Sequence, residues 1–207
     1  MKTSSSTVAI LLAAGGGSRF SGSEHKLAAL ISKRSVCSWS LQHLLDAKFE
    51  NVVVVTGAVK LHSALEIEDV NSSDTVQIVN NPLWQSGLAS SLQCGINVAR
   101  ELGAQAVVVG LADQPAVRAT AWLEVAASNS PLAVATYNGV RGNPVRLHAE
   151  LWQFLPETGD DGARMLFKSH RDLIEEIPCV GSAQDVDTIS DLEHLREVFE
   201  KIPTSNA

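Results

Sequence analysis

A glycine-rich segment followed by two basic residues is the first feature of this chain that indicates chemistry. Residues 11–19 are Leu-Leu-Ala-Ala-Gly-Gly-Gly-Ser-Arg, and Lys26 follows seven positions after Arg19. Glycines let backbone N–H groups approach a phosphate without an intervening Cβ, and Arg19 and Lys26 add positive charge where phosphates would lie. The dinucleotide pattern G-x-G-x-x-G fails because Phe20 stands at its last position, and no Gly-Lys pair provides a P-loop. The alternative is a surface loop with incidental charges.

A serine-rich segment is expected at the start of a helix. It spans residues 80–92 and places Ser90 and Ser91 in the first turn of a helical pattern. A helix N-terminus carries unpaired N–H groups and the positive end of the helix dipole, which together suit a nucleotide or another anion. Ser90 and Ser91 are therefore candidate nucleotide-binding residues. The alternative is that one of them is simply an N-cap.

Aspartates follow two apolar stretches that are expected to be strands. Asp113 lies in Gly-Leu-Ala-Asp-Gln-Pro at residues 110–115, and Asp185 and Asp187 lie in Asp-Val-Asp-Thr at residues 185–188. Carboxylates at strand ends emerge at the ligand edge of an α/β sheet, and they suit Mg²⁺, which takes one or two carboxylates plus substrate phosphates. The alternatives are a turn that begins at Asp113 and a helix cap that leaves the later aspartates in solvent.

Two further polar segments contain arginines beside turn residues. Residues 141–144 are Arg-Gly-Asn-Pro, and residues 159–164 are Gly-Asp-Asp-Gly-Ala-Arg, which predicts a turn followed by a helix. A helix N-terminus with Arg141 and Arg164 near it would attract an anionic acceptor, and Asn143 and Asp160 of the same segments are further candidate acceptor-binding residues. A surface turn with an ordinary salt bridge is an equal alternative.

Alternating strand and helix patterns must position these segments. Apolar, β-branched runs predict buried strands, and apolar residues three or four apart predict helices. The predicted strands are Val8–Leu12, Val52–Thr56, Val76–Asn80, Ala106–Leu111 and Leu132–Tyr137. The predicted helices are Val36–Ala47, Val59–Ile67, Ala89–Leu102 and Val117–Ser128. This order predicts a three-layer, Rossmann-like, doubly wound and mostly parallel α/β sheet, with ligands beyond the carboxyl ends of the strands.

The last third of the chain has a different pattern. Pro144 places the extended piece Asn143–Leu147 at a sheet edge or at a strand start, because proline cannot donate to a ladder. The other predicted elements are helices near Ala149–Leu155 and Ala163–Ser169, strands near Leu173–Ile177 and Gln184–Asp187, and a closing helix that Ser190 caps together with Glu193. Without an internal repeat or a linker, residues 1–207 are expected to form a single domain.

The composition excludes several classes of protein. The 207 residues include 16 Lys and Arg against 23 Asp and Glu, a net charge of −7, and 45% are hydrophobic. This excludes an intrinsically disordered chain and argues against a general binder of nucleic acid or membrane surfaces. No apolar run approaches the ~20 residues of a membrane span, and a buried first strand explains Val8–Ala14 better than a signal peptide does. Three scattered cysteines without metal-site spacing indicate a cytoplasmic protein.

Taken in order, these segments resemble the MobA-like nucleotidyltransferase superfamily, and within it the molybdenum cofactor cytidylyltransferase (MocA-like) branch. The resemblance runs from Val8 to about Val198. It rests on LAAGGGSRFSGSEHKL (12–27), NPLWQSGLASSLQCG (81–95), LADQP (111–115), GNPV (142–145), GDDGAR (159–164) and DVDTISDL (185–192). Co-occurrence of these motifs in this order is far more specific than any one of them.

The resemblance implies a nucleotide-diphospho-sugar transferase-like fold and roles for particular residues. The expected nucleotide-binding residues are Ala13, Ala14, Gly15, Gly16, Gly17, Ser18, Arg19, Lys26, Ser90 and Ser91, and the expected catalytic residues are Lys26, Arg19 and Asp113. Asp113 and Asp187 are the implied Mg²⁺ ligands, with Asp187 favoured over Asp185. The Leu-Ala-Ala-Gly form at residues 12–15 accompanies cytosine in this family and favours CTP over GTP. Residues 32–35, Ser-Lys-Arg-Ser, depart from the family because they lack the usual turn glycine.

The expected activity is transfer of CMP from CTP to the phosphate of an anionic, molybdopterin-type cofactor, with release of pyrophosphate and a molybdoenzyme as eventual partner. The acceptor phosphate is already a nucleophile, so positioning and charge stabilisation would do most of the catalysis. One alternative is nucleotidyl transfer to another phosphate, such as a sugar phosphate. Others are a non-catalytic protein that delivers a pterin cofactor and an NAD(P)- or flavin-dependent oxidoreductase, which the failed fingerprint at Phe20 disfavours.

Overall fold

A mostly parallel sheet forms the centre of the protein. The computed structural model describes residues 7–22, 24–59 and 75–201. Within them the central sheet has seven strands in the order β5-β4-β1-β6-β8-β7-β9, and β8 alone runs antiparallel to its neighbours. These strands are β1 (Thr7–Ala13), β4 (Val52–Thr56), β5 (Val76–Asn80), β6 (Ala106–Leu111), β7 (Leu132–Tyr137), β8 (Val140–His148) and β9 (Ile174–Pro178). The predicted doubly wound α/β sheet is confirmed.

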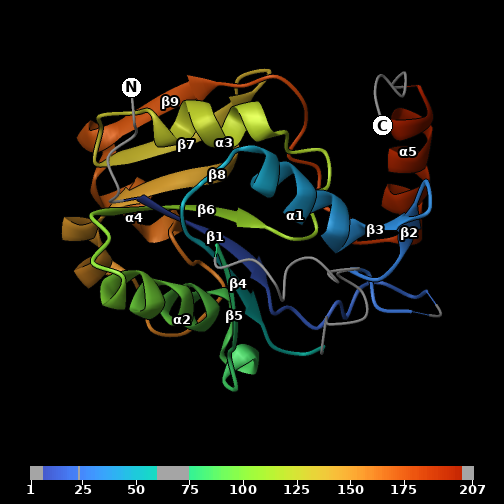
Figure 1. Cartoon of the computed structure of the whole chain (residues 1–207), viewed down its shortest axis with the longest axis horizontal. Coiled ribbons are helices and arrows are strands. Elements are labelled where there is room, and N and C mark those ends of the chain that lie inside the picture. The colour runs from blue at the N-terminus through green and yellow to red at the C-terminus, as the bar shows by residue number, and fades with distance from the viewer. Residues whose placement is uncertain (1–6, 23, 60–74, 202–207) are drawn as a thin grey trace.

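Helices cover both faces of this sheet (Figure 1), with α1 and α3 on one side and α2 on the other. The α-helices are α1 (Val36–Asp46), α2 (Leu88–Glu101), α3 (Ala119–Ala126), α4 (Arg164–Ser169) and α5 (Ile189–Glu200). Three 3₁₀ helices, η2 (Trp84–Ser86), η3 (Ala149–Phe154) and η4 (Arg171–Leu173), and a hairpin of β2 (Leu30–Ile31) and β3 (Arg34–Ser35) complete the described elements. The predicted helix at residues 59–67 lies, except for Val59, outside the described residues. None of the helices in the described part is long and apolar enough to cross a membrane.

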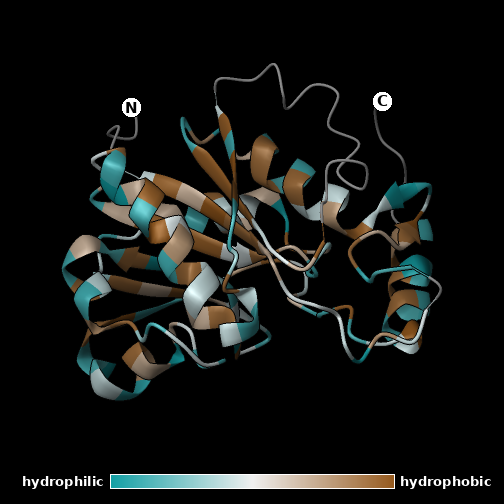
Figure 2. Cartoon of the chain, turned by 90° about the horizontal axis from the view of Figure 1, so that it is seen from below, coloured by the Kyte–Doolittle hydropathy of each residue, from teal (hydrophilic) through white to brown (hydrophobic). Residues whose placement is uncertain are grey.

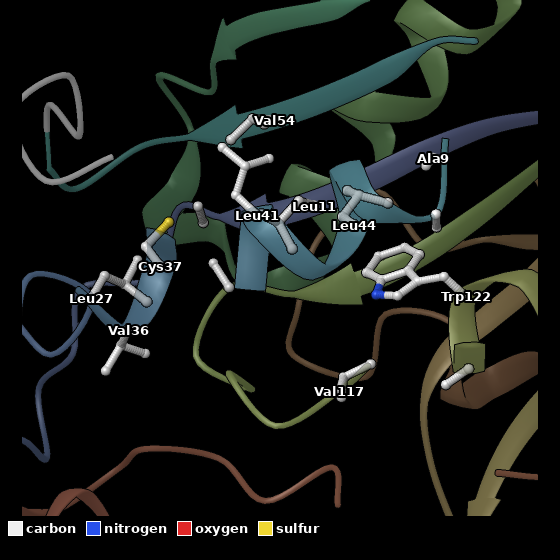
Figure 3. Packing of buried hydrophobic residues seen from close by; sticks show 14 of the residues in the cluster. Ala9, Leu11, Leu27, Val36, Cys37, Leu41, Leu44, Val54, Val117 and Trp122 are labelled. Carbon is white, nitrogen blue, oxygen red and sulfur yellow. The ribbon is translucent and has the colours of Figure 1, made fainter. Parts of the chain in front are cut away.

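The core consists of two hydrophobic clusters, one on each face of the sheet. Alternate residues of a strand point to opposite faces, so Leu11 of β1 belongs to the cluster that contains residues of α1, α3 and α5, while Ile10 belongs to the cluster that contains residues of α2, η3 and α4. Figure 3 shows Leu41 and Leu44 of α1 beside Leu11 and Val54 in the first cluster. Figure 2 shows hydrophobic colour concentrated in the central strands and hydrophilic colour on the outer turns. Burial of both faces explains why the strands are continuous apolar runs.

Pro144 lies in the middle of an interior strand, so its predicted position at an edge or a strand start is wrong. Strand β8 pairs with β6 only from Val145 onward, and its register with β7 shifts between Val134 and Thr136. Both ladders are therefore interrupted where Pro144 lacks its N–H donor. The sheet tolerates the proline because it falls at this irregularity.

Residues 184–187 are not a strand, which corrects a second prediction. Both edges of β6 are already occupied by β1 and β8, so the segment cannot pair beside β6. Its buried residue Val186 instead donates a backbone hydrogen bond of 2.9 Å to the carbonyl of Asp113 in the loop after that strand. This contact holds residues 184–187 across the carboxyl end of the sheet.

The closing helix α5 is present, but its cap differs from the predicted one. The N-cap is Thr188 rather than Ser190, and its hydroxyl accepts a hydrogen bond from the Asp191 N–H while the Asp191 carboxylate accepts one from the Thr188 N–H. Such a reciprocal capping box satisfies two backbone donors that the helix leaves unpaired. The same carboxylate accepts a bond from the Asp187 N–H and so fixes the residue that precedes the cap.

The hairpin of β2 and β3 forms although residues 32–35 lack the turn glycine that is usual in the family. Ser32 and Lys33 both adopt positive φ, 48° and 72°, as the two central residues of a type I′ turn do. Trp39 of α1 donates its indole N–H to the Ile31 carbonyl and holds the hairpin against the helix. The departure from the family pattern therefore leaves the turn in place.

Candidate active site

A cavity of about 490 Å³ opens at the carboxyl end of β1 and β6. Its lining includes nearly every residue predicted to bind a nucleotide: Ala13, Ala14, Gly15, Gly16, Gly17, Ser18, Arg19, Lys26 and Ser91. Asp113 and Asp187 line the same cavity. The edge at which parallel strands end thus collects the glycine loop, the two cations and the two carboxylates in one place.

Lys26 bridges the two aspartates. Its Nζ lies 2.5 Å from Asp113 Oδ2 and 3.0 Å from Asp187 Oδ1. The Lys26 side chain is only 11% exposed. Burial would lower the pKa of this lysine, but the attraction of Asp113 and the hydrogen bonds to both carboxylates outweigh it and raise the pKa above its usual value. The lysine is therefore a fixed positive charge at neutral pH.

Three different chain segments hold this cluster. Leu27, the neighbour of Lys26, is buried in the core and accepts a backbone hydrogen bond from Cys37 of α1. Asp113 directly follows Ala112, whose N–H bonds to the Leu12 carbonyl in β1. Asp187 is held by the α5 capping box described above. The geometry of the cluster is thus set by the sheet and the helices rather than by the charged side chains alone.

Arg19 is the exposed partner of this cluster. Its Nη2 lies 2.8 Å from Asp187 Oδ2, but its side chain is 75% exposed. An exposed ion pair of this kind contributes little to stability, so the guanidinium is free to exchange the carboxylate for a phosphate. The side chains of Lys26 and Arg19 can therefore bind an anionic ligand in different ways.

The glycine loop is contacted by a histidine that the sequence analysis did not single out. His25 Nε2 lies 3.1 Å from the Gly15 carbonyl, and Gly17 has a φ of +61°, which suits glycine. Burial is the main reason that the pKa of His25 is lowered. A Cβ on Gly16 would lie 2.9 Å from the Trp84 ring, so the loop approaches this tryptophan closely.

The serines at the start of α2 have separate roles. Both side chains are buried, but Ser91 lines the cavity, whereas the Ser90 hydroxyl shares its single proton between the carbonyls of Leu83 and Gly87. The Asn81 amide donates to both serine hydroxyls. Neither serine is the N-cap, which is Gly87. The structure therefore brings Ser91 to the cavity and gives Ser90 a structural position beside it.

The two carboxylates form a suitable donor set for a divalent cation. Within the described residues, no group of three or more His, Cys, Asp and Glu side chains converges on one point. However, Asp113 and Asp187 already enclose one cation, the ammonium of Lys26. Mg²⁺ needs only one or two protein carboxylates when substrate phosphates complete its shell, so the residues present fit such an ion.

A second cavity of about 560 Å³ adjoins the first, and Leu12, Leu88 and Leu111 line both. Three of the predicted acceptor-binding residues, Arg141, Asn143 and Arg164, line this second cavity. Arg141 also forms an ion pair of 2.6 Å with Glu176, as the alternative interpretation predicted. We refer to the two spaces as the nucleotide cavity and the acceptor cavity.

Asp160, the fourth predicted acceptor residue, lies in the nucleotide cavity, while its neighbour Asp161 lines the acceptor cavity. The turn at Gly159 packs against the start of α2, where the Ala89 N–H donates to the Gly159 carbonyl. At Gly87, whose φ is 100°, a Cβ would lie 2.5 Å from the Gly159 backbone. This close approach places Asp160 on the nucleotide side.

A chain of polar side chains crosses the wall of the acceptor cavity. The Asn143 amide donates to Gln114 Oε1 over 3.1 Å, and Gln114 Nε2 donates to Asp185 Oδ1 over 2.7 Å. Burial, followed by the negative charge of Asp113, raises the pKa of Asp185. Asp185 is thus bound to Gln114, whereas Asp187 contacts Lys26, and the choice of Asp187 over Asp185 as a metal ligand stays a prediction.

Among the lining residues that were not predicted from the sequence are Trp84, Gln85 and Gln114. Trp84 and Gln85 lie in the segment that leaves β5, and Gln114 directly follows Asp113. The motifs did contain a signal for these residues. A tryptophan and amide side chains in loops at the ligand edge of the sheet do not pack in the core, so a role in ligand binding is the expected explanation.

Comparison with known proteins agrees with this geometry. A model of the MobA-like NTP transferase domain matches residues 9–173. The purine catabolism protein PucB of Bacillus subtilis (strain 168) is 25% identical over 204 residues, which cover 93% of this chain and 97% of that protein.

Solved structures share the fold. A nucleotidyl transferase from Methanothermobacter thermautotroptrophicus superposes with a TM-score of 0.77 at 22% identity, covering 95% of this chain and 98% of that one. The inositol-1-phosphate CTP transferase from T. maritima superposes with a TM-score of 0.73 at 14% identity, covering 97% of each chain.

Proposed function

Because the chain belongs to the MobA-like NTP transferase family, whose model matches residues 9–173, we propose that it transfers CMP from CTP to the phosphate of a molybdopterin-type cofactor. The family and the fold establish a nucleotidyltransferase enzyme. The choice of CTP as the nucleotide, of Mg²⁺ as the ion and of a pterin as the acceptor goes beyond the family assignment and belongs to our proposal. The product would pass to a molybdoenzyme in the cytoplasm.

The observation that carries this proposal is the contact between the two cavities. The nucleotide cavity holds the glycine loop, Lys26 and the aspartates, and the acceptor cavity holds Arg141 and Arg164. Because the two share Leu12, Leu88 and Leu111, an α-phosphate in one and an acceptor phosphate in the other can meet at this boundary. Holding two reactants in attack geometry supplies much of the rate enhancement in such reactions.

The reaction proposed is an in-line displacement. An oxygen of the acceptor phosphate forms a bond to the α-phosphorus of CTP, and the bond from that phosphorus to the bridging oxygen breaks as pyrophosphate leaves. Lys26 and Arg19 bind and orient the negative phosphates, and no strong general base is required. Asp113 and Asp187 would hold Mg²⁺, which stabilises charge on the phosphates when bound.

Ala13 and Ala14 support cytosine as the base. Both are buried at the end of β1 and line the nucleotide cavity. The Ala14 carbonyl accepts a hydrogen bond of 3.1 Å from the Ala58 N–H, which fixes the backbone at this point. The methyl group of Ala14 beside this fixed backbone takes up space that a larger purine would need, so a small pyrimidine is favoured over guanine.

The test is release of pyrophosphate. The protein would be incubated with Mg²⁺, each of the four nucleoside triphosphates and a panel of phosphorylated acceptors that includes molybdopterin-type cofactor. We expect release only with CTP and that cofactor. Binding of the cofactor without release under any condition would instead identify a delivery protein, and release with GTP would overturn the base assignment.

A second candidate is CMP transfer to a different phosphorylated acceptor. The similarity to an inositol-1-phosphate CTP transferase favours it, because that protein's name combines CTP with a non-pterin phosphate on the same fold. Release of pyrophosphate from CTP with a polyol or sugar phosphate, and none with the pterin, would select this candidate.

A further inference from the structure

A third hollow, of about 500 Å³, lies next to the acceptor cavity. It is lined by Arg141, Arg164, Phe167, Lys168, Arg171 and Ile174. Arg141, Arg164 and Phe167 line the acceptor cavity as well. A ligand in the acceptor cavity can therefore extend past these three side chains into the hollow, which we call the basic hollow.

The basic hollow concentrates positive charge in an acidic protein. Among the described residues, four basic side chains line it, in a chain whose net charge is −7. The ion pair that the structure shows here joins Arg141 to Glu176, and neither Asp172 nor Glu175 lines the hollow. The hollow thus carries an excess of positive charge.

The spacing of these cations opposes folding rather than assisting it. Arg164 and Lys168 are four residues apart on α4, and Arg171 follows three residues later in η4. Residues four apart share one side of a helix, where the like charges of Arg164 and Lys168 repel and destabilise it, whereas Arg171 lies in the separate element η4. A bound anion would offset this repulsion.

An aromatic residue separates the two ends of the combined space. The Arg141 guanidinium carbon lies 5.8 Å from the centre of the Phe167 ring, and Phe167 packs against the core on the α2 side of the sheet. The space therefore offers an apolar body at Phe167, with Arg141 and Arg164 on the acceptor side and Lys168 and Arg171 beyond it.

We propose that the acceptor carries a second anionic group besides the reacting phosphate, which Lys168 and Arg171 bind on the far side of Phe167 from that phosphate. The proposal rests on the proposed function, because it takes the acceptor cavity as the place of the acceptor. It adds that the acceptor is a bis-anionic molecule long enough to span Phe167.

The experiment compares two probes of known charge, fructose 1,6-bisphosphate and fructose 6-phosphate. Each is titrated by calorimetry into the full chain, with the nucleotide cavity saturated by a non-hydrolysable CTP analogue. We expect the bisphosphate to bind about 10-fold or more tightly than the monophosphate, since a charge-assisted hydrogen bond contributes a factor of this order. The double variant K168Q/R171Q is expected to abolish that difference and to leave binding of the CTP analogue unchanged.

The matched control is K33Q/K201Q, which makes the same change of net charge at two exposed residues outside all three spaces. Equal affinities of the wild type for the two sugars, or an equal loss in the control, would overturn the proposal. Lys168-dependent binding of a polyglutamate peptide or single-stranded DNA, without a preference for the bisphosphate, would overturn it in favour of a macromolecular partner. Failure of the proposed function would differ, because the bisphosphate preference would persist without pyrophosphate release from any acceptor.

Discussion

The nucleotide cavity and the acceptor cavity differ in how their charges are held. In the nucleotide cavity, Lys26 contacts Asp113 and Asp187 at 2.5 and 3.0 Å and is nearly buried. In the acceptor cavity, the two arginines are exposed, and Arg141 pairs with a carboxylate that is itself exposed. The first cavity lies on the parallel strands β1 and β6, whereas the second is built on the interrupted strand β8 and on α4.

This difference separates the part of the reaction that must be fixed from the part that can vary. Phosphate and metal chemistry requires charges that do not reorganise during the reaction, and the buried lysine cluster provides them. Recognition of one acceptor among many needs side chains on adaptable segments, and the exposed Arg141 on the interrupted strand β8 and Arg164 on the short helix α4 provide those. Substitutions in the first cavity should therefore change turnover, and those in the second should change acceptor affinity.

The largest effect is expected from Asp113→Asn and Asp187→Asn. Each should lower turnover by about 10²–10³, the range seen when one preorganised electrostatic group is removed from an active site. Each should also raise the Mg²⁺ concentration needed for half-maximal rate. Lys26 keeps one carboxylate partner in either variant, so the fold should survive. The measurement is pyrophosphate release across a Mg²⁺ titration, alongside thermal unfolding.

The matched control for this pair is Asp46→Asn, at the exposed end of α1. It should retain the wild-type rate at every Mg²⁺ concentration. Wild-type turnover at low Mg²⁺ in the Asp113 or the Asp187 variant would show that the residue concerned is not a metal ligand.

Lys26→Ala should follow, with an effect that depends on the length of the phosphate chain. The lysine's charge is expected beside the β- and γ-phosphates, so CTP affinity should fall by roughly 10- to 150-fold, equivalent to ~1.5–3 kcal/mol. CMP affinity should change far less. Calorimetry with the two nucleotides measures this, with Lys201→Ala as the control, and equal losses for CMP and CTP would place Lys26 away from the terminal phosphates.

Most strands of the sheet could be predicted from the sequence alone. Strands such as Val52–Thr56 and Ala106–Leu111 are apolar, β-branched runs whose local pattern already specifies burial on both faces. The position of Pro144 could not be predicted in the same way. It depends on which strands flank β8 and where their register shifts, and both are properties of distant residues.

Prediction of the site was likewise limited by contacts between residues that are distant in the sequence. The glycine loop and both aspartates could be placed at one sheet edge, because each follows or faces the end of a strand. The bridge that joins them could not, since Lys26 and its partners are 87 and 161 positions apart. Asp160 likewise lies on the nucleotide side because of its contact with α2, which no local pattern encodes.

The substitution Arg164→Gln tests the difference between the two cavities from the acceptor side. The KM for the phosphorylated acceptor should rise by about 10-fold, as expected for loss of one charged hydrogen bond, while the KM for CTP and kcat change little. Arg100→Gln is the matched control, because Arg100 is also an exposed arginine, 5.7 Å over the ring of Trp152 and outside both cavities. A fall in kcat with an unchanged acceptor KM would contradict the division of labour between the cavities.

Ala14→Gly should have the smallest effect, a partial loss of base selectivity. Ala14 is buried and packs beside Gly57 so closely that a Cβ on Gly57 would lie 2.9 Å from the Ala14 methyl group. Removing the methyl opens space at the end of β1 and frees the backbone there. Because removal of one methyl group changes discrimination by shape by only ~1 kcal/mol, the lower end of the range for such groups, the ratio of CTP to GTP affinity should fall by about 5-fold without reversing. Competition binding of the two nucleotides measures the ratio in both proteins.

The control for this last substitution is Ala112→Gly, which removes a methyl group from a buried residue beside Asp113 that does not line the nucleotide cavity. Its CTP to GTP ratio should match that of the wild type, because any general loosening of the sheet edge would appear there as well. A wild-type preference for GTP, or an Ala14→Gly ratio equal to the control's, would remove cytidine as the donated nucleoside. The nucleotidyltransferase assignment would then stand on the family and the Lys26 cluster alone, because neither depends on the base.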